Sequence, residues 1–308
     1  MQSTAIRIGT RGSPLALAQA HETRRRLAAA LALPEAAIAI VTIRTSGDRI
    51  VDRPLSEVGG KGLFTKEIDD AMLAGEIDIA VHSAKDLPTA LPDGIALAAA
   101  LPREDTRDAL LSSKAARIED LPEGAVLGTS SLRRRAMALR LRPDLRVVDF
   151  RGNVETRIRK LEDGVADATI LAMAGLNRLG LAGRAAGAID APGWLPAVAQ
   201  GTIAITARTG DDASRERLAR IDDAPTSVTL GAERAFLAVL DGSCRTPIGG
   251  LATLGADGTL TIRGVIVRPD GSEAHEASRT GPAADAIALG AAVGDELHRR
   301  GGPGFFAG

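Results

Sequence analysis

The sequence predicts an α/β protein with two similar lobes, whose mixed, mostly parallel sheets surround a cleft, and a small α+β domain at the C-terminus. Three observations predict this fold. Apolar strand patterns alternate with helical patterns through the first two thirds of the chain. A Gly-Thr turn that leads through a serine into a helix begins at Gly9 and again at Gly128. After Cys244, three strand patterns are joined by Asp-Gly turns, with one helical pattern before the cysteine and one after the last strand.

Length and composition restrict the class of protein. At about 150 residues per domain, 308 residues make two or three domains. A content of 45% hydrophobic and 25% charged residues is typical of a globular chain. A single cysteine excludes a disulfide framework, and the four histidines are too widely spread to predict a zinc site. Because there is neither an apolar leader nor a long apolar run, we expect a cytoplasmic protein without a membrane span.

The charge and the aromatic content argue against nucleic-acid binding. The formal net charge is −1, and aromatic residues make up 2% of the chain, with no tyrosine. A uniformly basic surface would be expected of a protein that binds nucleic acid through its phosphates. Proteins that grip single strands by base stacking also need more aromatic side chains than this chain has. We therefore expect no nucleic-acid partner.

The first lobe begins with a clear helix signal. Ser13 followed by Pro14 is an N-cap residue with proline at the first helical position. The Gly-rich, charged loop Ser46–Gly62 predicts a mobile lid. The elements expected around these signals are strands at Ala5–Ile8, Ala37–Arg44 and Ile77–Val81, and helices at Leu15–Leu31 and Phe64–Ala74.

The second lobe repeats the order of the first. Strand Val126–Leu127 leads into helix Leu132–Leu141, and Gly164-x-x-Asp167 leads into strand Ala168–Ala172, as Gly75-x-x-Asp78 leads into Ile77–Val81. This weak internal repeat predicts strand ends and helix starts around one cleft, which is where open α/β sheets bind ligands. The chain is expected to cross between the lobes near Leu101–Arg103 and Leu195–Ala197, and to return to the first lobe with strand Thr202–Ala207 and a helix ending near Arg220.

Three domains are therefore expected: residues 1–101 with 200–220, residues 102–199, and residues 221–308. Ala224–Thr226 predicts a linker before the last of them. The elements expected in that domain are helices at Ser227–Leu240 and Ala283–Arg300, and strands at Gly249–Leu254, Thr259–Val267 and Glu273–Arg279.

Basic side chains gather in residues 133–160. This segment holds ten basic and three acidic residues, a local balance of +7. Arginine binds carboxylates and phosphates through its planar fork, and a helix start adds backbone N–H groups. We therefore expect anion binding by Arg133, Arg134 and Arg151, with phosphate and polycarboxylate both open. A solvated helix face is expected for the remaining arginines of interest, Arg140, Arg142 and Arg146.

Two further segments are candidates for chemistry. His82–Asp86 ends a buried strand, so its polar side chains face a cleft if the sheet is parallel; an ordinary Lys/Asp turn is the alternative. We interpret His82 itself as a structural, hydrogen-bonded histidine. Cys244 lies in a Gly- and Pro-rich turn beside Arg245, where a thiolate is stabilised, although a lone cysteine is otherwise a small buried hydrophobe.

Together these segments resemble the hydroxymethylbilane synthase (porphobilinogen deaminase) family over nearly the whole chain. The matching motifs are Ile8–Leu17, Val58–Phe64, Ala80–Pro88, Gly128–Arg134, Arg151–Val154, Leu195–Gly201, Glu233–Arg234 and Gly242–Gly249. So many matches in order are highly specific. Gly12, Ala199 and the stretch Ser243–Thr246 differ from the residues more usual in the family, but no charged or nucleophilic group is lost.

The resemblance implies an activity, a cofactor and a fold. Members of this family carry a dipyrromethane on a cysteine through a thioether, and that cysteine corresponds to Cys244. They are transferases that join four porphobilinogen units with loss of ammonia and release the linear product hydroxymethylbilane. Their first two domains resemble a periplasmic binding protein. The partners implied are porphobilinogen and the growing oligopyrrole chain, and the expected state is a monomer.

The resemblance also implies roles for individual residues. The catalytic carboxylate corresponds to Asp86, which we interpret as stabilising a cationic azafulvene and moving its pyrrole proton. The residues expected to bind the cofactor and the substrate are Arg11, Ser13, Gln19, Lys61, Ser83, Lys85, Thr129, Ser130, Ser131, Arg133, Arg134, Arg151, Arg157, Arg178 and Gln200. No metal is expected. The alternative functions are a bilobal solute-binding or ligand-sensing protein without catalysis and, further behind, a nucleic-acid binder that uses residues 133–160.

Overall fold

The computed structural model describes residues 6–49, 62–240 and 246–306. Two predicted site residues, Lys61 and Cys244, and residues 50–61 of the predicted lid lie outside these ranges. The chain divides into two compact units. Unit 1 consists of Met1–Glu104 and Thr202–Ser227, and unit 2 of Asp105–Gly201 and Val228–Gly308.

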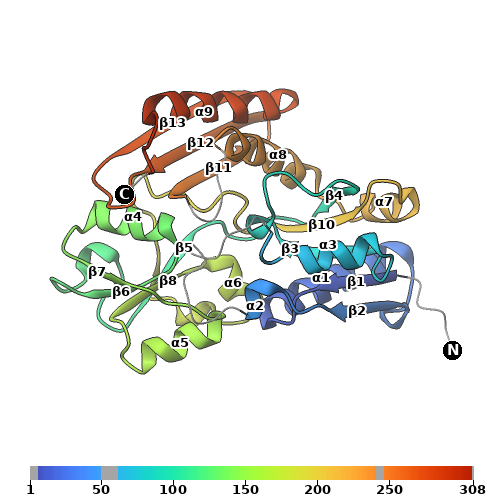
Figure 1. Cartoon of the computed structure of the whole chain (residues 1–308), viewed down its shortest axis with the longest axis horizontal. Helices are drawn as coiled ribbons and strands as arrows, with labels where there is room; N and C mark the ends of the chain where they lie inside the picture. The colour runs from blue at the N-terminus through green and yellow to red at the C-terminus, as the bar shows by residue number, and fades with distance from the viewer. Residues whose placement is uncertain (1–5, 50–61, 241–245, 307–308) are drawn as a thin grey trace. The chain divides into compact units, whose positions relative to one another are not determined.

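Unit 1 is built on a five-stranded sheet with the order β2-β1-β3-β10-β4 (Figure 1). Strands β2, β1 and β3 are parallel, whereas β10 runs antiparallel to both of its neighbours. The strands are β1 (Ile6–Thr10), β2 (Ile38–Thr42), β3 (Ile79–Ser83), β4 (Ile95–Ala100) and β10 (Ile203–Arg208). The helices of unit 1 are α1 (Pro14–Leu31), α2 (Ser46–Arg49), α3 (Lys66–Leu73) and α7 (Asp212–Ala219).

Helices cover both faces of this sheet. Ala20 and Leu27 of α1 and Leu218 of α7 pack in one apolar cluster with strand residues such as Ile79. Ile68 and Met72 of α3 pack in a second cluster with Ala80, the next residue along β3. Because successive strand residues point to opposite faces, α3 lies on the face opposite α1 and α7. Continuous apolar strands buried on both faces are typical of α/β layers.

The first sheet of unit 2 repeats this plan, with the order β7-β6-β8-β5-β9. Strands β7, β6 and β8 are parallel, and β5 runs antiparallel to both of its neighbours. The strands are β5 (Asp108–Ser112), β6 (Val126–Gly128), β7 (Arg146–Val148), β8 (Ala168–Ala172) and β9 (Gly187–Ala188). The helices that belong to this sheet are α4 (Leu132–Leu141), α5 (Val154–Glu162) and α6 (Met173–Arg178).

The internal repeat extends to single hydrogen bonds. In unit 1, Asp78 accepts the backbone N–H of Arg7 at 2.7 Å, at the start of β1. In unit 2, Asp167 accepts the backbone N–H of Val126 at 2.7 Å, at the start of β6. Each aspartate follows a glycine with positive φ at the end of a helix. The Gly-x-x-Asp similarity predicted from the sequence is therefore confirmed.

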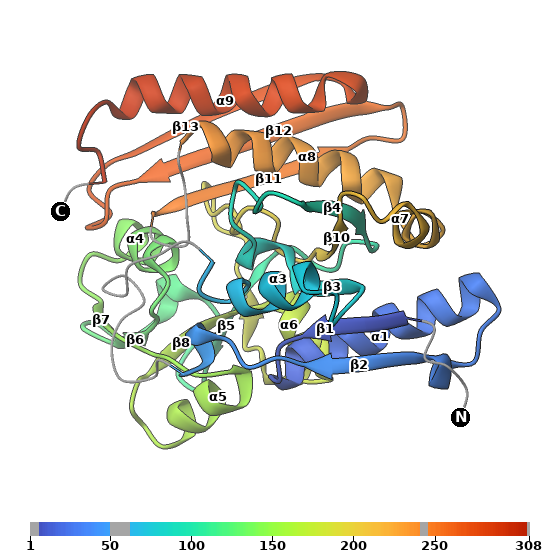
Figure 2. The ribbon, with the colours of Figure 1, turned by 45° about the vertical axis from the view of Figure 1, so that its right-hand side comes forward.

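A three-stranded antiparallel sheet completes unit 2. Its elements are α8 (Ala224–Val239), β11 (Ile248–Leu254), β12 (Thr259–Val267), β13 (Ala274–Pro282) and α9 (Ala286–Gly301). Gly250 and Gly264 are paired across β11 and β12, and a Cβ on either would overlap the ring of Phe236 from α8. Gly290 of α9 approaches the backbone of α8 so closely that it leaves no room for a side chain. Figure 2 shows α9 along this sheet with α8 beside it.

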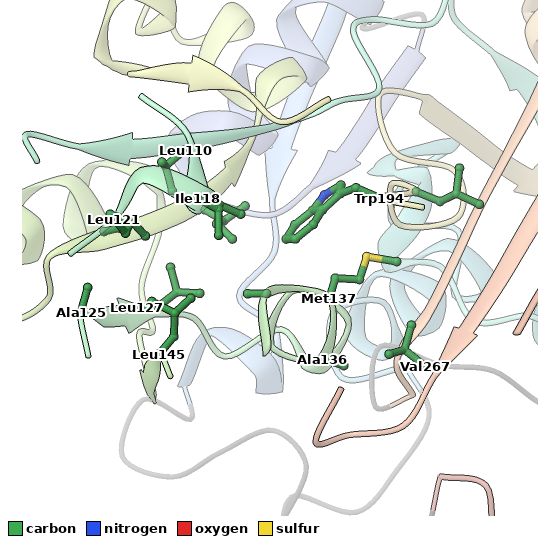
Figure 3. Packing of buried hydrophobic residues seen from close by; sticks show 14 of the residues in the cluster. Leu110, Ile118, Leu121, Ala125, Leu127, Ala136, Met137, Leu145, Trp194 and Val267 are labelled. Atoms are coloured by element: carbon green, nitrogen blue, oxygen red, sulfur yellow. The ribbon is translucent and has the colours of Figure 1, made fainter. Parts of the chain in front are cut away.

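Helix α4 packs against both sheets of unit 2. Ala136 and Met137 share one buried cluster with Leu127 of β6 and with Val267 of β12. Figure 3 shows Met137 between Trp194 and Val267. At the β12–β13 turn, a Cβ on Gly271 would meet the backbone of α4. Glycine here therefore allows the turn to lie close to α4, and it also adopts the positive φ of 79° that the turn needs.

Most predicted elements are confirmed, and several expectations change. Ala224–Thr226 is not a linker: α8 begins at Ala224, because proline is tolerated in a first helical turn and the Asp223 carboxylate accepts the N–H of Thr226 at 3.0 Å.

Arg140 and Arg146 are exposed as expected. Arg142 instead donates to backbone carbonyls of residues 118–122 and so fastens that segment. Strands β4, β5, β7 and β9 were not predicted.

Candidate active site

The turn between β1 and α1 presents the first predicted site residues. Ser13 Oγ accepts the N–H of Ala16 at 3.3 Å, which confirms the predicted N-cap. A Cβ on Gly9 would overlap the side chain of Ile77, so the close approach of the strand end requires glycine. The turn leaves Arg11 in the extended segment just before the helix, where its side chain is 22% exposed.

Arg11 has two carboxylate neighbours in unit 1. Its guanidinium forms an ion pair with Asp48 and lies 3.8 Å from Oδ2 of Asp86. Its Cζ also lies 4.2 Å from the ring centroid of Phe64, which is a cation–π contact. Burial would raise the pKa of Asp48, but hydrogen bonds from Arg11 and Thr45 outweigh it and hold that pKa below its usual range. Asp48 therefore stays ionised as the first partner of Arg11.

The end of β3 carries the predicted polar cluster. The amide of Gln19 and the hydroxyl of Ser83 form two hydrogen bonds, at 2.9 and 3.2 Å. Lys85 and Asp86 lie in the short 3₁₀ turn Ala84–Asp86 that follows the strand, and the Asp86 side chain is 33% exposed. An open pocket of about 60 Å³ is lined by Arg11, Ser13, Gln19, Ser83 and Asp86, among other residues. Five predicted site residues therefore meet in unit 1.

His82 is a further lining residue of this pocket. It is 5% exposed, and its Nε2 is 3.4 Å from the hydroxyl of Thr206. Burial, with a further contribution from the charge of Arg11, lowers the pKa of His82 to about 4. The imidazole is therefore neutral at pH 7, which supports the prediction that it is a structural residue.

The turn between β6 and α4 is the corresponding site of unit 2. Ser131 caps the helix by accepting the N–H of Arg134 at 3.4 Å. Thr129 Oγ1 accepts the N–H of Ser131 at 3.2 Å, and Ser130 Oγ accepts the N–H of Phe150 at 2.9 Å. The three predicted hydroxyl residues therefore form one turn at a helix start, which is a favourable place for an anion.

Arg133 and Arg134 occupy the first turn of α4, and both are buried on one carboxylate. Arg133 Nη2 lies 2.8 Å from Oδ2 of Asp108, and Arg134 Nη2 lies 2.7 Å from Oδ1. The two arginine side chains are 4% and 7% exposed, and Asp108 is fully buried. Burial would raise the pKa of Asp108, but the two guanidinium charges outweigh it and hold that pKa far below its usual range.

The other predicted residues of unit 2 are Arg151 just before α5, Arg157 on α5, Arg178 on α6 and Gln200 before β10. Arg157 Nε donates to the carbonyl of Gly152 at 2.9 Å, and Lys160 donates to the carbonyl of Arg151 at 3.1 Å. Arg178 donates to the carbonyl of Gly201 at 2.9 Å. Fully buried Gln200 donates to the carbonyl of Thr106 at 2.8 Å and to Asp108 at 3.0 Å. These bonds fix the backbone before α5, just before β10 and before β5.

Glu233 connects α8 to the segment that precedes β10. Its two oxygens accept the N–H groups of Ala199 at 2.6 Å and of Ala252 at 2.7 Å, and the side chain is fully buried. Ala199 has a φ of 65°, a left-handed conformation that is uncommon for a residue other than glycine. The carboxylate therefore holds a strained turn next to Gln200.

Sequence reasoning missed three partners of the predicted residues. Asp48 lies in the charged loop that was interpreted only as a lid. Asp108 was hidden at the head of an unexpected strand, although an aspartate before the apolar run Ala109–Leu111 is a usable signal for a buried ion pair. Trp194 Nε1 donates to Oδ2 of Asp108 at 2.9 Å. As the only tryptophan of the chain, it had no pattern that could reveal this contact.

The part of the chain that the structure describes holds no group of three or more His, Cys, Asp or Glu side chains that could bind a metal ion. No helix within the same ranges is long and apolar enough to cross a membrane. The donors that the structure does bring together are guanidinium, hydroxyl and amide groups, which suit carboxylate ligands.

Known proteins resemble this chain over most of its length. Residues 6–216 match the family model "Porphobilinogen deaminase, dipyromethane cofactor binding domain", and residues 228–299 match "Porphobilinogen deaminase, C-terminal domain". The porphobilinogen deaminase of Paracoccus denitrificans is 59% identical over 98% of this chain and 96% of its own length. That of Nitrobacter winogradskyi is 59% identical over 97% and 94%. Among solved structures, a nutrient binding protein from Burkholderia cenocepacia bound to methionine is 15% identical, with a TM-score of 0.44 over 72% of this chain and 93% of its own.

Proposed function

The chain belongs to the porphobilinogen deaminase family, and from this premise we propose which of its residues carry out the reaction. The family activity is that of a transferase, hydroxymethylbilane synthase, in tetrapyrrole biosynthesis. It joins four porphobilinogen units, releases ammonia at each addition, and uses a dipyrromethane cofactor. The observation that supports our assignment is the pocket of unit 1, where Arg11 and Asp86 face the same space.

The donors of that pocket fit the cofactor. Each pyrrole ring of a dipyrromethane carries an acetate and a propionate, and the Arg11 guanidinium is a bidentate partner for such groups. The pyrrole N–H groups require an acceptor, which Asp86 provides. We propose that Cys244, outside the described residues, attaches the group through a thioether. When bound, the group supplies the pyrrole carbon to which the first substrate unit is joined.

Asp86 is the proposed catalytic residue. The aminomethyl group of porphobilinogen resembles a lysine side chain, with a reference pKa near 10.4, so it is already an ammonium at pH 7. Ammonia leaves with the bonding electrons and generates a pyrrole-methylene cation, the azafulvene. A carboxylate held beside it stabilises this cation and accepts the pyrrole N–H as a hydrogen bond. Arg11, 3.8 Å from Asp86, keeps that carboxylate oriented.

We propose that the remaining predicted residues bind carboxylates of the substrate and of the growing chain. Electrostatics supports this. Every added ring brings two negative charges, and the protein, with a net charge of only −1, must gather local positive charge to offset them. Guanidinium, ammonium, hydroxyl and amide groups all contribute donors. The residues that carry them are Arg11, Ser13, Gln19, Lys61, Ser83, Lys85, Thr129, Ser130, Ser131, Arg151, Arg157 and Arg178. The buried Arg133 and Arg134 contribute their positive charge at the start of α4, and the buried Gln200 supports them.

Replacement of Asp86 by asparagine tests this assignment. Asp86→Asn keeps the size of the side chain and removes its charge, so we expect kcat to fall about 100-fold or more while KM changes little. Turnover is measured as consumption of porphobilinogen together with release of ammonia. The exposed Asp93, in the same unit, provides the matched control, and Asp93→Asn should turn over like the wild type.

Intact mass makes the kinetic result interpretable. The wild type and Asp86→Asn should both show an excess mass of two porphobilinogen units less two ammonia, and Cys244→Ser should lack it. Near wild-type turnover by a loaded Asp86→Asn protein would refute the role of Asp86. An unmodified wild type that porphobilinogen cannot load or drive to turnover would instead favour a binding protein without catalysis.

Two coarser expectations complete the proposal. We propose that the protein works as a monomer in the cytoplasm. The single cysteine supports a reducing compartment, because it leaves no partner within the chain for a disulfide. The partners are then small molecules, porphobilinogen and the oligopyrrole made from it.

A further inference from the structure

Asp108 is the centre of a buried polar cluster in unit 2. Its Oδ1 accepts from Arg134 Nη2 at 2.7 Å, Arg134 Nε at 3.1 Å and Gln200 Nε2 at 3.0 Å. Its Oδ2 accepts from Trp194 Nε1 at 2.9 Å and pairs with Arg133 Nη2 at 2.8 Å. All of these residues belong to unit 2. A single carboxylate therefore determines where four side chains lie.

The cluster carries an unbalanced charge. Two guanidiniums face one carboxylate, so a net charge of +1 is buried at the start of α4. Burial lowers the pKa of Arg133, and Asp108 opposes this effect. Among the described side chains, Arg133 Nε is one of the few buried polar atoms without a hydrogen-bond partner. A buried charge of this kind costs free energy, which is acceptable where it serves a ligand.

One further nitrogen of each arginine donates to a backbone carbonyl. Arg134 Nη1 donates to the carbonyl of Ile170 at 2.9 Å, and Arg133 Nη1 donates to that of Leu195 at 2.8 Å. These contacts tie α4 to β8 and to the segment that leads towards β10. Gln200 and the carbonyl of Thr106 tie the same segment to the start of β5. The arginines are therefore held in one orientation before any ligand arrives.

We propose that Asp108 is a positioning residue, which fixes the guanidiniums of Arg133 and Arg134 so that substrate carboxylates meet a preorganised positive charge at the start of α4. This inference rests on the proposed role of the two arginines in binding carboxylates. Preorganised charge acts more strongly than mobile charge, because no reorganisation is needed when the ligand binds. Asp108 itself is fully buried, so it acts through the arginines and touches no substrate.

The sign of the change in KM tests the proposal. If Asp108 only neutralised part of the arginine charge, Asp108→Asn would raise the charge of the cluster from +1 to +2. The stronger attraction for substrate carboxylates would then lower KM. If Asp108 positions the arginines, freeing them should raise KM about tenfold or more, with a smaller change in kcat. The holoprotein is assayed well below its unfolding temperature, and intact mass verifies that both proteins are equally loaded.

Tryptophan emission gives a readout that is independent of activity. Trp194 is the only tryptophan and there is no tyrosine, so the emission reports this cluster alone. In Asp108→Asn the indole N–H loses its charged acceptor, and the emission maximum should shift from its wild-type wavelength. An unchanged emission together with an unchanged or lower KM would overturn the proposal.

Two further variants keep the test decisive. Asp144→Asn removes the exposed partner of Arg142 at the other end of α4, and it should leave KM and emission at their wild-type values. Trp194→Phe removes one donor to Asp108 while it keeps an aromatic ring, and it should raise KM two- to threefold. If Asp108→Asn does not fold, Trp194→Phe decides: an unchanged or lower KM refutes positioning. Wild-type turnover in the same assay separates this failure from a failure of the proposed function.

Discussion

The two turns that start α1 and α4 share their backbone plan but place arginine differently. In both, a Gly-Thr pair lies at the end of the preceding strand, with Thr10 the last residue of β1 and Thr129 just after β6, and a serine caps the helix. In unit 1, Arg11 precedes the cap and is 22% exposed in the pocket beside Asp86. In unit 2, Arg133 and Arg134 follow the cap and are buried on Asp108. The two turns therefore differ in what their arginines can reach: Arg11 lines a pocket, whereas Arg133 and Arg134 are fixed on a buried carboxylate.

The strands that end beside these turns differ in a second way. Counted from Asp78 in unit 1 and Asp167 in unit 2, His82 of β3 corresponds to Leu171 of β8, and Asp86 corresponds to Gly175. The catalytic carboxylate that we propose thus has no counterpart in unit 2. With that proposal, a repeated scaffold carries the catalytic carboxylate in one copy and a buried source of positive charge in the other.

The largest expected effect separates a buried arginine from an accessible one. Arg134→Met breaks a buried ion pair and leaves the Ile170 carbonyl without its donor, so the free energy of unfolding should fall by about 3 kcal/mol. Arg11→Met should change it by less than about 1 kcal/mol, because a partly exposed pair contributes little. Its kcat/KM should nevertheless fall at least tenfold. Urea unfolding and steady-state kinetics measure the two quantities.

Arg135→Met is the matched control for the buried site. Arg135 lies next to Arg134 on α4 and is exposed, so its replacement should alter stability by about 0.5 kcal/mol at most. Equal losses of stability in Arg134→Met and Arg11→Met would contradict the distinction between the two turns.

His82 gives unit 1 a pH dependence that Leu171 cannot give unit 2. The folded-state pKa of His82 is about 4, against 6.5 for an ordinary histidine, because the ring is buried. Below pH 6.5 the unfolded chain therefore binds the proton more readily than the folded one. Stability from this residue is fully present above pH 6.5 and is lost as the pH falls to 4, by about 3 kcal/mol in total.

His82→Leu, which installs the residue found in unit 2, tests this linkage. The variant should lose less stability than the wild type between pH 6.5 and 4, measured by urea unfolding at several pH values. Burial raises the pKa of Asp69 to about 6, but both proteins contain this residue, so its contribution cancels in the difference. Parallel pH profiles for the two proteins would show that His82 does not titrate as its burial requires.

Much of the fold was predictable because local signals and packing agree. Three local signals each act over a few residues, and the structure confirms them: the Ser13 cap, the Asp-Gly turns and the apolar run of β8. Where the prediction fails, a residue outside the local segment decides the structure. The proline of Ala224–Thr226 was interpreted as a break, but the Asp223 carboxylate, from outside the segment, makes it a helix start.

The candidate site was predictable only in part, for a related reason. Motif matches identify Arg133 and Arg134, but their burial depends on Asp108, more than 20 residues away in sequence. No periodicity reveals such a partner, because an ion pair between two elements depends on how they pack. The contacts of Arg11 with Asp48 and Phe64 depend in the same way on a loop and a helix start that meet only in the folded unit.

The smallest predicted effect compares two alanines with positive φ, Ala32 at the end of α1 and Ala199 before Gln200. Glycine relieves the left-handed strain at both, but it adds entropy to the unfolded chain. Ala32 is exposed, so Ala32→Gly should stabilise the protein by about 0.5 kcal/mol in urea unfolding. Ala199 is 2% exposed, and loss of its buried methyl should cancel the gain. A clear gain in the free energy of unfolding of Ala199→Gly would show that backbone strain outweighs the packing of the methyl group there. The Glu233 carboxylate would then hold this turn in a conformation that costs more than the buried methyl contributes.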